Sequence, residues 1–575
     1  AASMACVFKG LHFVGLSLAL LAVGAAGRSS SILPEVAKAL PDEDAKAIES
    51  QAEQLQEALR PVCASMPHNE GGKMSRSVVR YVLHRLFMQR GWSVRGLEPD
   101  GKGWHEGSPE EVLKDGMPAQ VVELFGARIA GEGLDLADVA LLAAAFKAMV
   151  RGEVRERLEA VYRAHNLEKA TALAQEQSIL VLDTYVAAYV TGANISALNE
   201  FQVSGLLNKA RRQYHSLPQV LKLAGAVKQD LVGEAAASFS DLERVAEEFG
   251  ERFGPAEDGR ECRPRKKELL ELEEGTSGRV KLSTFYRAAL DDGKWHFGES
   301  KDYLRQLGAL DETDSSNLQV IIPNYVASKS NCADTSRYYS ACCLSECEAL
   351  LGRLEIAIGS PSGLPSEIAP LVAAMDSDTV PGNRTLPAQL LRRLDEVAEG
   401  NGGRVPLHGR LFAQWLHHAY PRECPFPHLS GTTSPARVEE WAALEGQQAA
   451  ASREEMRQHV EASESAEDGK VEEEEEMDDD GECAPWMADE EILAPHWHAP
   501  SSKARCGFLQ PSAVRRPEEV TQRGSASVLW WVATAVLLIA ALATGAVRLP
   551  EAPKESGRAG RGQADRNLGG LSMYS

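Results

Sequence analysis

The chain has 575 residues, 44% of them hydrophobic, which is enough for roughly two to four domains with buried cores. Its formal net charge is −22, but residues 461–482 alone hold 13 acidic residues and one lysine. The rest of the chain is only mildly acidic and has no basic patch of the kind that nucleic-acid binding requires. We therefore expect no nucleic-acid partner.

The first segment has the three parts of a secretory signal peptide. After Met4 come a basic residue, Lys9, an apolar run over residues 11–23 and the small residues of 24–27. The run is shorter than the roughly 20 residues that cross a bilayer. We predict a signal peptide over 4–27; the alternative is a buried N-terminal helix.

Helical periodicity dominates the chain up to about residue 430. Segments such as "DEDAKAIESQAEQLQEAL" and "EKATALAQEQSILVLDTYVAAYV" place apolar residues at helical spacing. The only convincing strand candidate is "LQVIIPNYV", which is short and interrupted by Pro323. We predict an all-α ectodomain, divided into a helical domain over 28–235 and a cysteine-containing domain over 236–430.

Two glycine-rich loops in the second domain have the outline of EF-hand loops between helices. "GTSGRVKLSTFY" and "GNGGRVPLHGRLF" share G-R-V-x-L and then an aromatic residue, and "NEGGKMSRSVVRYVLHRLF" is a looser third copy. With Gly278 and Gly403 at the sixth place, the eighth is Val280 or Val405, as an EF-hand expects. These repeats predict EF-hand-like helix-loop-helix units.

The calcium ligands of an EF-hand are missing from both loops. Places 1, 3, 5, 7, 9 and 12 are Glu273, Gly275, Ser277, Arg279, Lys281 and Thr284 in the first loop, and Ala398, Gly400, Gly402, Arg404, Pro406 and Gly409 in the second. Neither has the bidentate glutamate at place 12, and a divalent cation needs several carboxylates. We therefore assign no metal ligand; a calcium-responsive protein with degenerate loops is the alternative.

Nine cysteines follow the signal segment and precede the C-terminal apolar run, which suits an oxidising lumen. Cys343 and Cys347 share a helix face and are ill-placed to pair with each other, so neighbours such as Cys262 or Cys424 are better partners. The disulfide candidates are Cys63, Cys262, Cys332, Cys342, Cys343, Cys347 and Cys424. Zinc held by His417, His418, Cys424 and His428 is the alternative at the last of these.

The remaining segments predict how the ectodomain meets a membrane. From residue 431 the chain turns polar and then strongly acidic, which predicts a disordered acidic stalk over 431–525. Residues 528–547 are uncharged and begin with two tryptophans, so we predict a transmembrane helix over 526–547 and a cytosolic tail over 548–575. Asn194 and Asn383 are glycosylation candidates on the lumenal side.

Two segments carry a resemblance to a known group. "VIIPNYVASKSNCADTSRYYSACCLSECEALL" and "GGRVPLHGRLFAQWLHHAYPRECPFPH" resemble an uncharacterised family of single-pass secretory-pathway membrane proteins of unicellular algae and protists, over roughly residues 40–430. That family has no established activity, so the resemblance implies a framework role for the cysteines and G-R-V loops and transfers no functional residue.

No catalytic motif is present, and we predict no catalytic residue and no cofactor. The sequence predicts a type I single-pass membrane protein of the cell surface or endomembranes, with a disulfide-stabilised, non-enzymatic ectodomain that binds an unidentified protein partner or acts as a scaffold. A membrane-anchored lumenal enzyme of unknown reaction is a further alternative.

Overall fold

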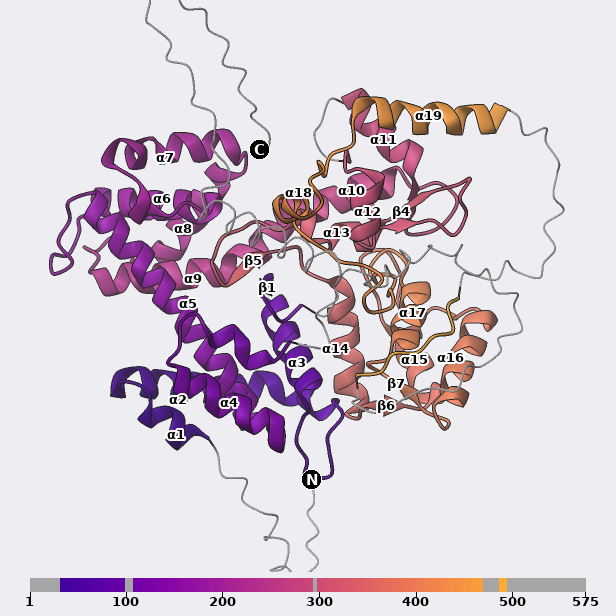
Figure 1. The fold of residues 1–575 in the computed structure, drawn as a ribbon, viewed down its shortest axis with the longest axis horizontal. Helices are drawn as coiled ribbons and strands as arrows, with labels where there is room; N and C mark the ends of the chain where they lie inside the picture. The colour runs from indigo at the N-terminus through magenta and orange to yellow at the C-terminus, as the bar shows by residue number, and fades with distance from the viewer. Residues whose placement is uncertain (1–31, 99–106, 293–296, 469–485, 494–575) are drawn as a thin grey trace, which may run out of the picture.

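A computed structural model describes residues 32–98, 107–292, 297–468 and 486–493 (Figure 1). The predicted signal peptide, transmembrane helix and cytosolic tail lie outside these residues. Within them, no helix is both long enough and apolar enough to cross a membrane. The described part is mostly helical, which confirms the predicted all-α class at that level.

The helices are α1 (Leu33–Lys38), α2 (Asp42–Ala64), α3 (Arg76–Met88), α4 (Ala119–Gly131), α5 (Leu136–Ala164), α6 (Gln175–Thr191), α7 (Glu200–Gln213), α8 (Leu217–Leu231), α9 (Phe239–Glu257), α10 (Arg263–Glu271), α11 (Leu282–Asp292), α12 (Lys301–Gln306), α13 (Ile322–Val326), α14 (Glu346–Ile358), α15 (Pro365–Ala374), α16 (Ala388–Gly400), α17 (Arg410–Ala419), α18 (Val438–Glu445) and α19 (Arg453–Asp468). The strands are β1 (Trp92–Val94), β2 (Arg279–Lys281), β3 (Leu310–Asp311), β4 (Gln319–Ile321), β5 (Tyr339–Ala341), β6 (Ser362–Gly363) and β7 (Val405–Pro406). Single turns are η1 (Pro109–Leu113), η2 (Ile195–Ala197), η3 (Asp258–Cys262) and η4 (Lys329–Asn331).

These elements form four lobes, each made of two helix-loop-helix units whose loops pair antiparallel. Lobe 1 (residues 32–150) pairs Met74 with Leu134, and lobe 2 (151–257) pairs Leu173 with Ala237. Lobe 3 (263–331 with 436–468) pairs β2 with β4, and lobe 4 (346–424) pairs β6 with β7. Figure 1 shows lobes 1 and 2 on the left and lobes 3 and 4 on the right.

Each loop pair is sealed by buried residues at its bridge. Met74 and Leu134 are completely buried and exchange backbone hydrogen bonds of 2.8 and 3.1 Å. Leu173 and Ala237 do the same at 2.8 and 3.0 Å. Each lobe then has a hydrophobic core of its own, so the loop pair is the common architectural unit of the chain.

The long helix α5 belongs to two lobes. Its first half packs in the core of lobe 1 and its second half in the core of lobe 2. Asp135 begins the helix by accepting a hydrogen bond from the backbone N–H of Asp138 at 3.0 Å. The predicted division near residue 235 is wrong, because it falls between α8 and α9, which share the core of lobe 2.

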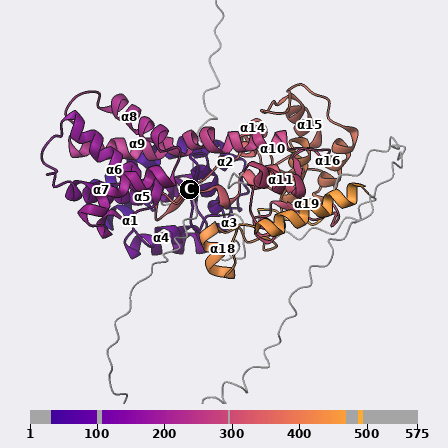
Figure 2. The ribbon, with the colours of Figure 1, turned by 90° about the horizontal axis from the view of Figure 1, so that it is seen from above.

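The predicted disordered stalk also needs correction. Helix α19 lies along α11 in both views of the ribbon, and its Met456 is buried in the core of lobe 3 together with Trp441 of α18 (Figures 1 and 2). Residues 486–493 lie on lobe 4. Charged composition hid these contacts, because a few apolar side chains at helical spacing suffice to fix a helix against a core. The strongly acidic residues 469–485 lie outside the described part.

The strand candidate around Pro323 is confirmed in its first half. Residues 319–321 form β4, the middle strand of a three-stranded sheet with order β2-β4-β3. Helix α13 begins directly afterwards with Pro323 in its first turn, where a missing N–H removes no intrahelical bond. The proline therefore ends the strand by starting a helix.

Candidate functional site

The polar centre of the molecule is built around a disulfide-closed loop. Cys332 and Cys342 are bonded, and their neighbours Ala333 and Ala341 form an antiparallel bridge that turns residues 332–342 into a tight loop. Strand β5 in this loop pairs antiparallel with β1 of lobe 1, with Trp92 opposite Ala341. The loop therefore adds a strand to lobe 1 although it follows lobe 3 in sequence.

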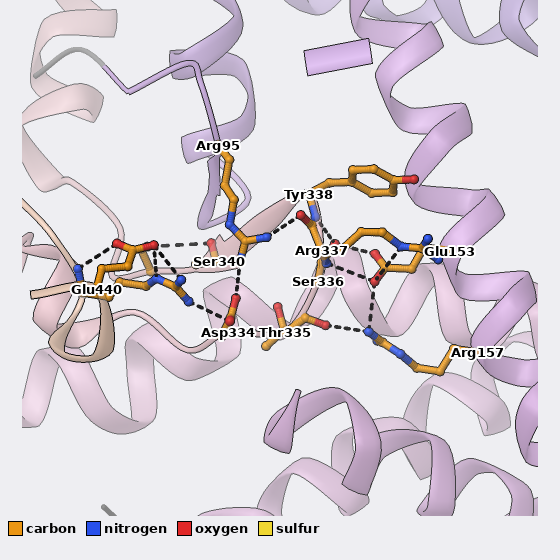
Figure 3. Close-up of polar contacts among 12 residues, drawn as sticks. Arg95, Glu153, Arg157, Asp334, Thr335, Ser336, Arg337, Tyr338, Ser340 and Glu440 are labelled. Carbon is orange, nitrogen blue, oxygen red and sulfur yellow. Dashed lines mark hydrogen bonds and ion pairs between the residues drawn. The ribbon is translucent and has the colours of Figure 1, made fainter. Parts of the chain in front are cut away.

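One side of the loop is held by arginines from two lobes. Asp334 accepts a hydrogen bond from Arg95 of lobe 1 (Figure 3). It also forms an ion pair with Arg437 of lobe 3, with a nitrogen–oxygen distance of 2.7 Å. Arg95 also donates to the carbonyl oxygen of Arg337. Arg437 in turn pairs with Glu440 at 2.6 Å. One carboxylate therefore connects two lobes across the loop.

The other side of the loop meets helix α5 through a buried carboxylate. Glu153 accepts hydrogen bonds from the Ser336 hydroxyl and, at 3.0 Å, from the backbone N–H of Arg337 (Figure 3). Arg157 pairs with Glu153 at 3.2 Å and donates to the carbonyl of Thr335 at 2.9 Å. Burial alone would lower the pKa of Arg157, but Tyr185 and Glu153 outweigh that effect and raise it.

Aromatic rings complete the junction beneath these charges. Tyr339 stacks on Trp92 of lobe 1, with ring centroids 4.4 Å apart, and its hydroxyl lies 3.1 Å from that of Tyr189 in lobe 2. Burial raises the pKa of Tyr339 well above its usual range, so it stays a neutral phenol. The loop thus contacts lobes 1 and 2 through both polar and apolar groups.

A cleft of about 520 Å³ lies beside this loop, and Cys262, Cys332 and Cys342 are among its lining residues. Several of its charged groups are already paired. Tyr214 donates to Glu257, Ser216 donates to Glu261, and Arg260 forms an ion pair with Glu257 at 2.6 Å. The cleft walls are therefore held in place mainly by contacts between neighbouring helices.

Glu299 is an acid of the cleft with one buried oxygen that accepts no hydrogen bond from the described residues. Its Oε1 accepts from the Tyr325 hydroxyl at 2.8 Å, and its buried Oε2 has no hydrogen-bond partner among the described residues. Burial raises the pKa of this carboxyl. Through this oxygen Glu299 can accept a hydrogen bond from a small polar molecule when it is ionised, or donate one when it is protonated. Within the described residues, no group of three histidine, cysteine or acidic side chains is arranged to hold a metal ion.

Six of the cysteines that the structure describes form three disulfides, which confirms that the chain is disulfide-bonded. The pairs are Cys262–Cys343, Cys332–Cys342 and Cys347–Cys424. The proposed partners for Cys343 and Cys347 are thus the ones found. The prediction of Cys63 as a disulfide candidate is wrong among the described residues: it is a buried, unpaired thiol in the core of lobe 1. Burial raises its pKa to about 12.

The histidines near Cys424 serve packing in this structure. Cys424 is in its disulfide, and Nδ1 of His417 donates to the Cys424 carbonyl at 2.7 Å. His428 bonds the Gly308 carbonyl of lobe 3 at 2.7 Å. Burial lowers the pKa of His417 to about 3 and also lowers that of His428. The two glycosylation candidates, Asn194 and Asn383, both lie in exposed turns.

No family model matches this chain, and comparison with curated proteins and with solved structures finds no significant match either.

Most residues of the junction could not be identified from the sequence. Arg95, Glu153, Arg157 and Arg437 are ordinary helix or loop residues in the sequence, separated by up to several hundred positions. The closely spaced Cys332 and Cys342 were the one available signal, because a short disulfide loop must present its intervening residues to something. What it meets depends on how the lobes are arranged.

Proposed function

We propose that the chain is a type I single-pass membrane protein of the secretory pathway, whose lumenal or extracellular part is a non-enzymatic, disulfide-braced scaffold that binds a protein partner. This keeps the topology that the terminal segments and the family resemblance predict.

One observation carries the proposal. The polar side chains of the junction are used to join lobes: Asp334 connects lobes 1 and 3, and Glu153 of α5 holds the loop that follows lobe 3. A catalytic centre needs polar groups that are free to meet a substrate. A scaffold needs them bonded to one another, as they are here, so that its outer faces keep a fixed relation.

We further propose that the lobes are EF-hand-like pairs in which side chains of the protein replace the metal charge. Paired loops joined at one apolar bridge are what EF-hand geometry would give, and every pair contains a basic side chain bonded to loop oxygen atoms. Lys73 bonds Glu132 in lobe 1, Lys228 bonds the Gly233 carbonyl at 2.9 Å in lobe 2, Arg279 bonds Asp311 at 2.9 Å in lobe 3, and Arg404 bonds the Ser362 hydroxyl at 3.0 Å in lobe 4.

Glu273, at the first ligand place of the lobe 3 loop, supports the same proposal. Its carboxylate is bonded in a bidentate manner by Arg422, with distances of 2.9 and 2.6 Å. Unlike a calcium ion, the ammonium or guanidinium group of a side chain is covalently attached to the protein. No free ion then has to be taken out of water to fill the loop. Such loops are expected to be stable without calcium.

Topology and scaffolding are tested on the full chain expressed in a secretory cell. We expect a glycosidase-sensitive mobility shift that is lost in the variant Asn194→Gln/Asn383→Gln. In sealed microsomes, we expect protease to reach only the C-terminal tag. Glycosylation at neither site together with a protected C-terminal tag would refute the proposal. For the scaffold, hydrogen exchange of Glu153→Gln is expected to rise in residues 332–342 and at β1 while the four cores stay protected.

The calcium alternative is tested by thermal unfolding of the same protein. Curves recorded with calcium and with chelator are expected to coincide. A midpoint raised by several degrees in calcium would mean that the loops bind the ion after all, and the fixed-cation proposal would be wrong.

A further inference from the structure

Residues 486–493, "WMADEEIL", form a short segment docked on lobe 4, here called the docked segment. It stands alone in the described part of the chain, because residues 469–485 before it and 494–575 after it lie outside that part. None of its eight residues is fully buried, although Trp486 packs against the core of lobe 4 and Leu493 against that of lobe 1. It is also held by a dense set of directional contacts.

Arg410, at the start of α17, binds the backbone of the docked segment. The residue is only 5% exposed. Its guanidinium donates to the carbonyl of Asp489 at 2.7 Å and to that of Met487 at 2.9 Å. Two groups on its other side orient it: the buried Gln414 side chain of lobe 4 at 3.1 Å, and the Pro427 carbonyl, just after lobe 4 in the chain, at 3.3 Å. The guanidinium is therefore positioned by lobe 4 and satisfied by the docked segment.

The main chain of the docked segment also pairs with lobe 4 as an added strand. Gly409 and Ile492 form an antiparallel bridge, the N–H of Arg410 donates to the Glu491 carbonyl at 2.9 Å, and the N–H of Leu493 donates to the His408 carbonyl at 3.3 Å. Backbone pairing at an exposed edge is a common way for proteins to bind an extended peptide.

Side chains of the docked segment supply the chemical selectivity. The Glu490 carboxylate accepts from the backbone N–H of Leu411 in the first turn of α17, at 3.0 Å, where a helix favours negative charge. Glu491 accepts from the backbone N–H of Ser430 at 3.0 Å. These contacts favour two consecutive acids.

An aromatic residue at the first position completes the pattern. The guanidinium carbon of Arg393 lies over the ring of Trp486, 5.1 Å from the ring centroid. The same ring stacks on His418, with the two ring centroids 6.0 Å apart. A cation over an indole face is a favourable contact even at a partly exposed site.

We propose that this face of lobe 4 is a binding site for an extended acidic peptide led by an aromatic residue, and that the docked segment is its resident occupant, displaced by a protein partner that carries a peptide of the same chemistry. The proposal rests on the partner binding proposed above and names the partner's chemistry. Residues 469–485, directly before the docked segment, include the acidic runs 472–476 and 478–480, and like charge this close in sequence disfavours binding of the resident Glu490 and Glu491 relative to a peptide without it.

The test uses a fluorescent synthetic peptide of residues 485–494 and the full chain in detergent. In the variant Trp486→Ala/Glu490→Ala/Glu491→Ala the resident segment loses its side-chain contacts and keeps only its main-chain ones, while the receptor face of lobe 4 is unchanged. A segment joined to its site by the same chain is present there at an effective concentration on the order of 1 mM. The peptide is therefore expected to bind this variant about tenfold or more tightly than the wild type.

Two controls make the outcome specific. Adding Arg410→Met to the variant is expected to abolish peptide binding, with an unchanged thermal midpoint showing that lobe 4 is still folded. A scrambled peptide of the same composition is expected to bind no variant. Equal affinity for wild type and variant, or binding that survives Arg410→Met in a folded protein, would overturn the proposal.

Sedimentation of the wild-type chain excludes a competing occupant. A monomer is expected, and a dimer that the triple variant abolishes would mean that the segment is exchanged between two copies, against the proposal of a different partner. A failed peptide titration with a normal glycosylation and protease result refutes this site alone. A failed topology result refutes the proposed function itself.

Discussion

The N-terminal half of the described chain, lobes 1 and 2, and the C-terminal half, lobes 3 and 4, use the same bridged loop pairs but are held together differently. In the N-terminal half α2 has 23 residues and α5 has 29, and α5 passes from one core into the next. In the C-terminal half α12 and α13 have only 6 and 5 residues. There the lobes touch through side chains and close backbone contacts.

The cross-links follow the same division. The six cysteines that are paired within the described residues lie at or after residue 262, whereas Cys63 in the N-terminal half is a thiol. The C-terminal half is also supplemented by α18, α19 and the docked segment. Short helices are marginal by themselves. The comparison teaches that a continuous helix joins two lobes without further help, while lobes built from short helices need disulfides and added segments.

The largest expected loss of stability comes from breaking a buried cluster of charges that joins the two halves. Arg85 of lobe 1 forms ion pairs with Glu355 and Glu348 of lobe 4, and the Arg85 and Glu355 side chains are 2% and 1% exposed. Glu355→Gln leaves the guanidinium poorly compensated and is expected to lower the free energy of unfolding by about 3–5 kcal/mol.

Urea denaturation measures this loss, with Glu396→Gln as the control. Glu396 pairs with Arg393 from a side chain that is 50% exposed, so its substitution is expected to cost less than about 1 kcal/mol. Similar losses for the two variants would show that the buried cluster does not hold the halves together.

The next effect tests the dependence of the C-terminal half on its cross-links. Cys347→Ser/Cys424→Ser removes a disulfide with a sequence separation of 77 residues and is expected to cost about 2–4 kcal/mol. Hydrogen exchange should then rise in lobes 3 and 4 and stay unchanged in lobes 1 and 2. Equal loss of protection in both halves would contradict the division drawn above.

A smaller effect tests the close contact between lobes 3 and 4. A Cβ on Gly278 would lie 2.1 Å from the Pro421 carbonyl oxygen, whereas one on Gly403 would meet nothing within 4 Å, although φ is +77° and +86° respectively. Both alanine variants strain the backbone, but only Gly278→Ala also forces the lobes apart. We expect it to cost about 1–3 kcal/mol more than Gly403→Ala in thermal unfolding. Equal losses would mean that the lobes separate freely.

The smallest effect is a pH dependence located in the C-terminal half. Burial lowers the pKa of His417 to about 3, below the value of about 6.5 in the unfolded chain. The unfolded state therefore binds a proton first as pH falls below 6.5, and stability is lost progressively toward pH 3. Between pH 7 and 5.5 this histidine is expected to remove about 1 kcal/mol of stability.

The variant His417→Asn keeps a donor for the Cys424 carbonyl but cannot titrate in this range. Its stability should fall less than that of the wild type between these two pH values, by denaturation at each pH. Parallel losses in the two proteins would rule out His417 as the source.

Much of the local structure was predictable from short-range patterns. The apolar spacing of "DEDAKAIESQAEQLQEAL" gives α2, and the G-R-V motifs mark β2 and β7 at the loop bridges. Of the strands that face them, β4 at Val320 was indicated only by the apolar run around Pro323, and β6 at Gly363 had no signal in the sequence. The bridges at Leu134 and Ala237 had no signal either, because one buried apolar residue in a loop is common.

The sequence by itself determined the helical class, the cysteine-rich framework and the positions of the two G-R-V strands, since these depend on residue type and spacing within a few turns. Only the tertiary structure decided the four lobes, the junction around the Cys332–Cys342 loop and the docking of residues 486–493. Those features depend on contacts between residues far apart in the chain, such as Glu153 with Arg337 and Arg410 with Asp489, whose side chains carry no local mark of their partners.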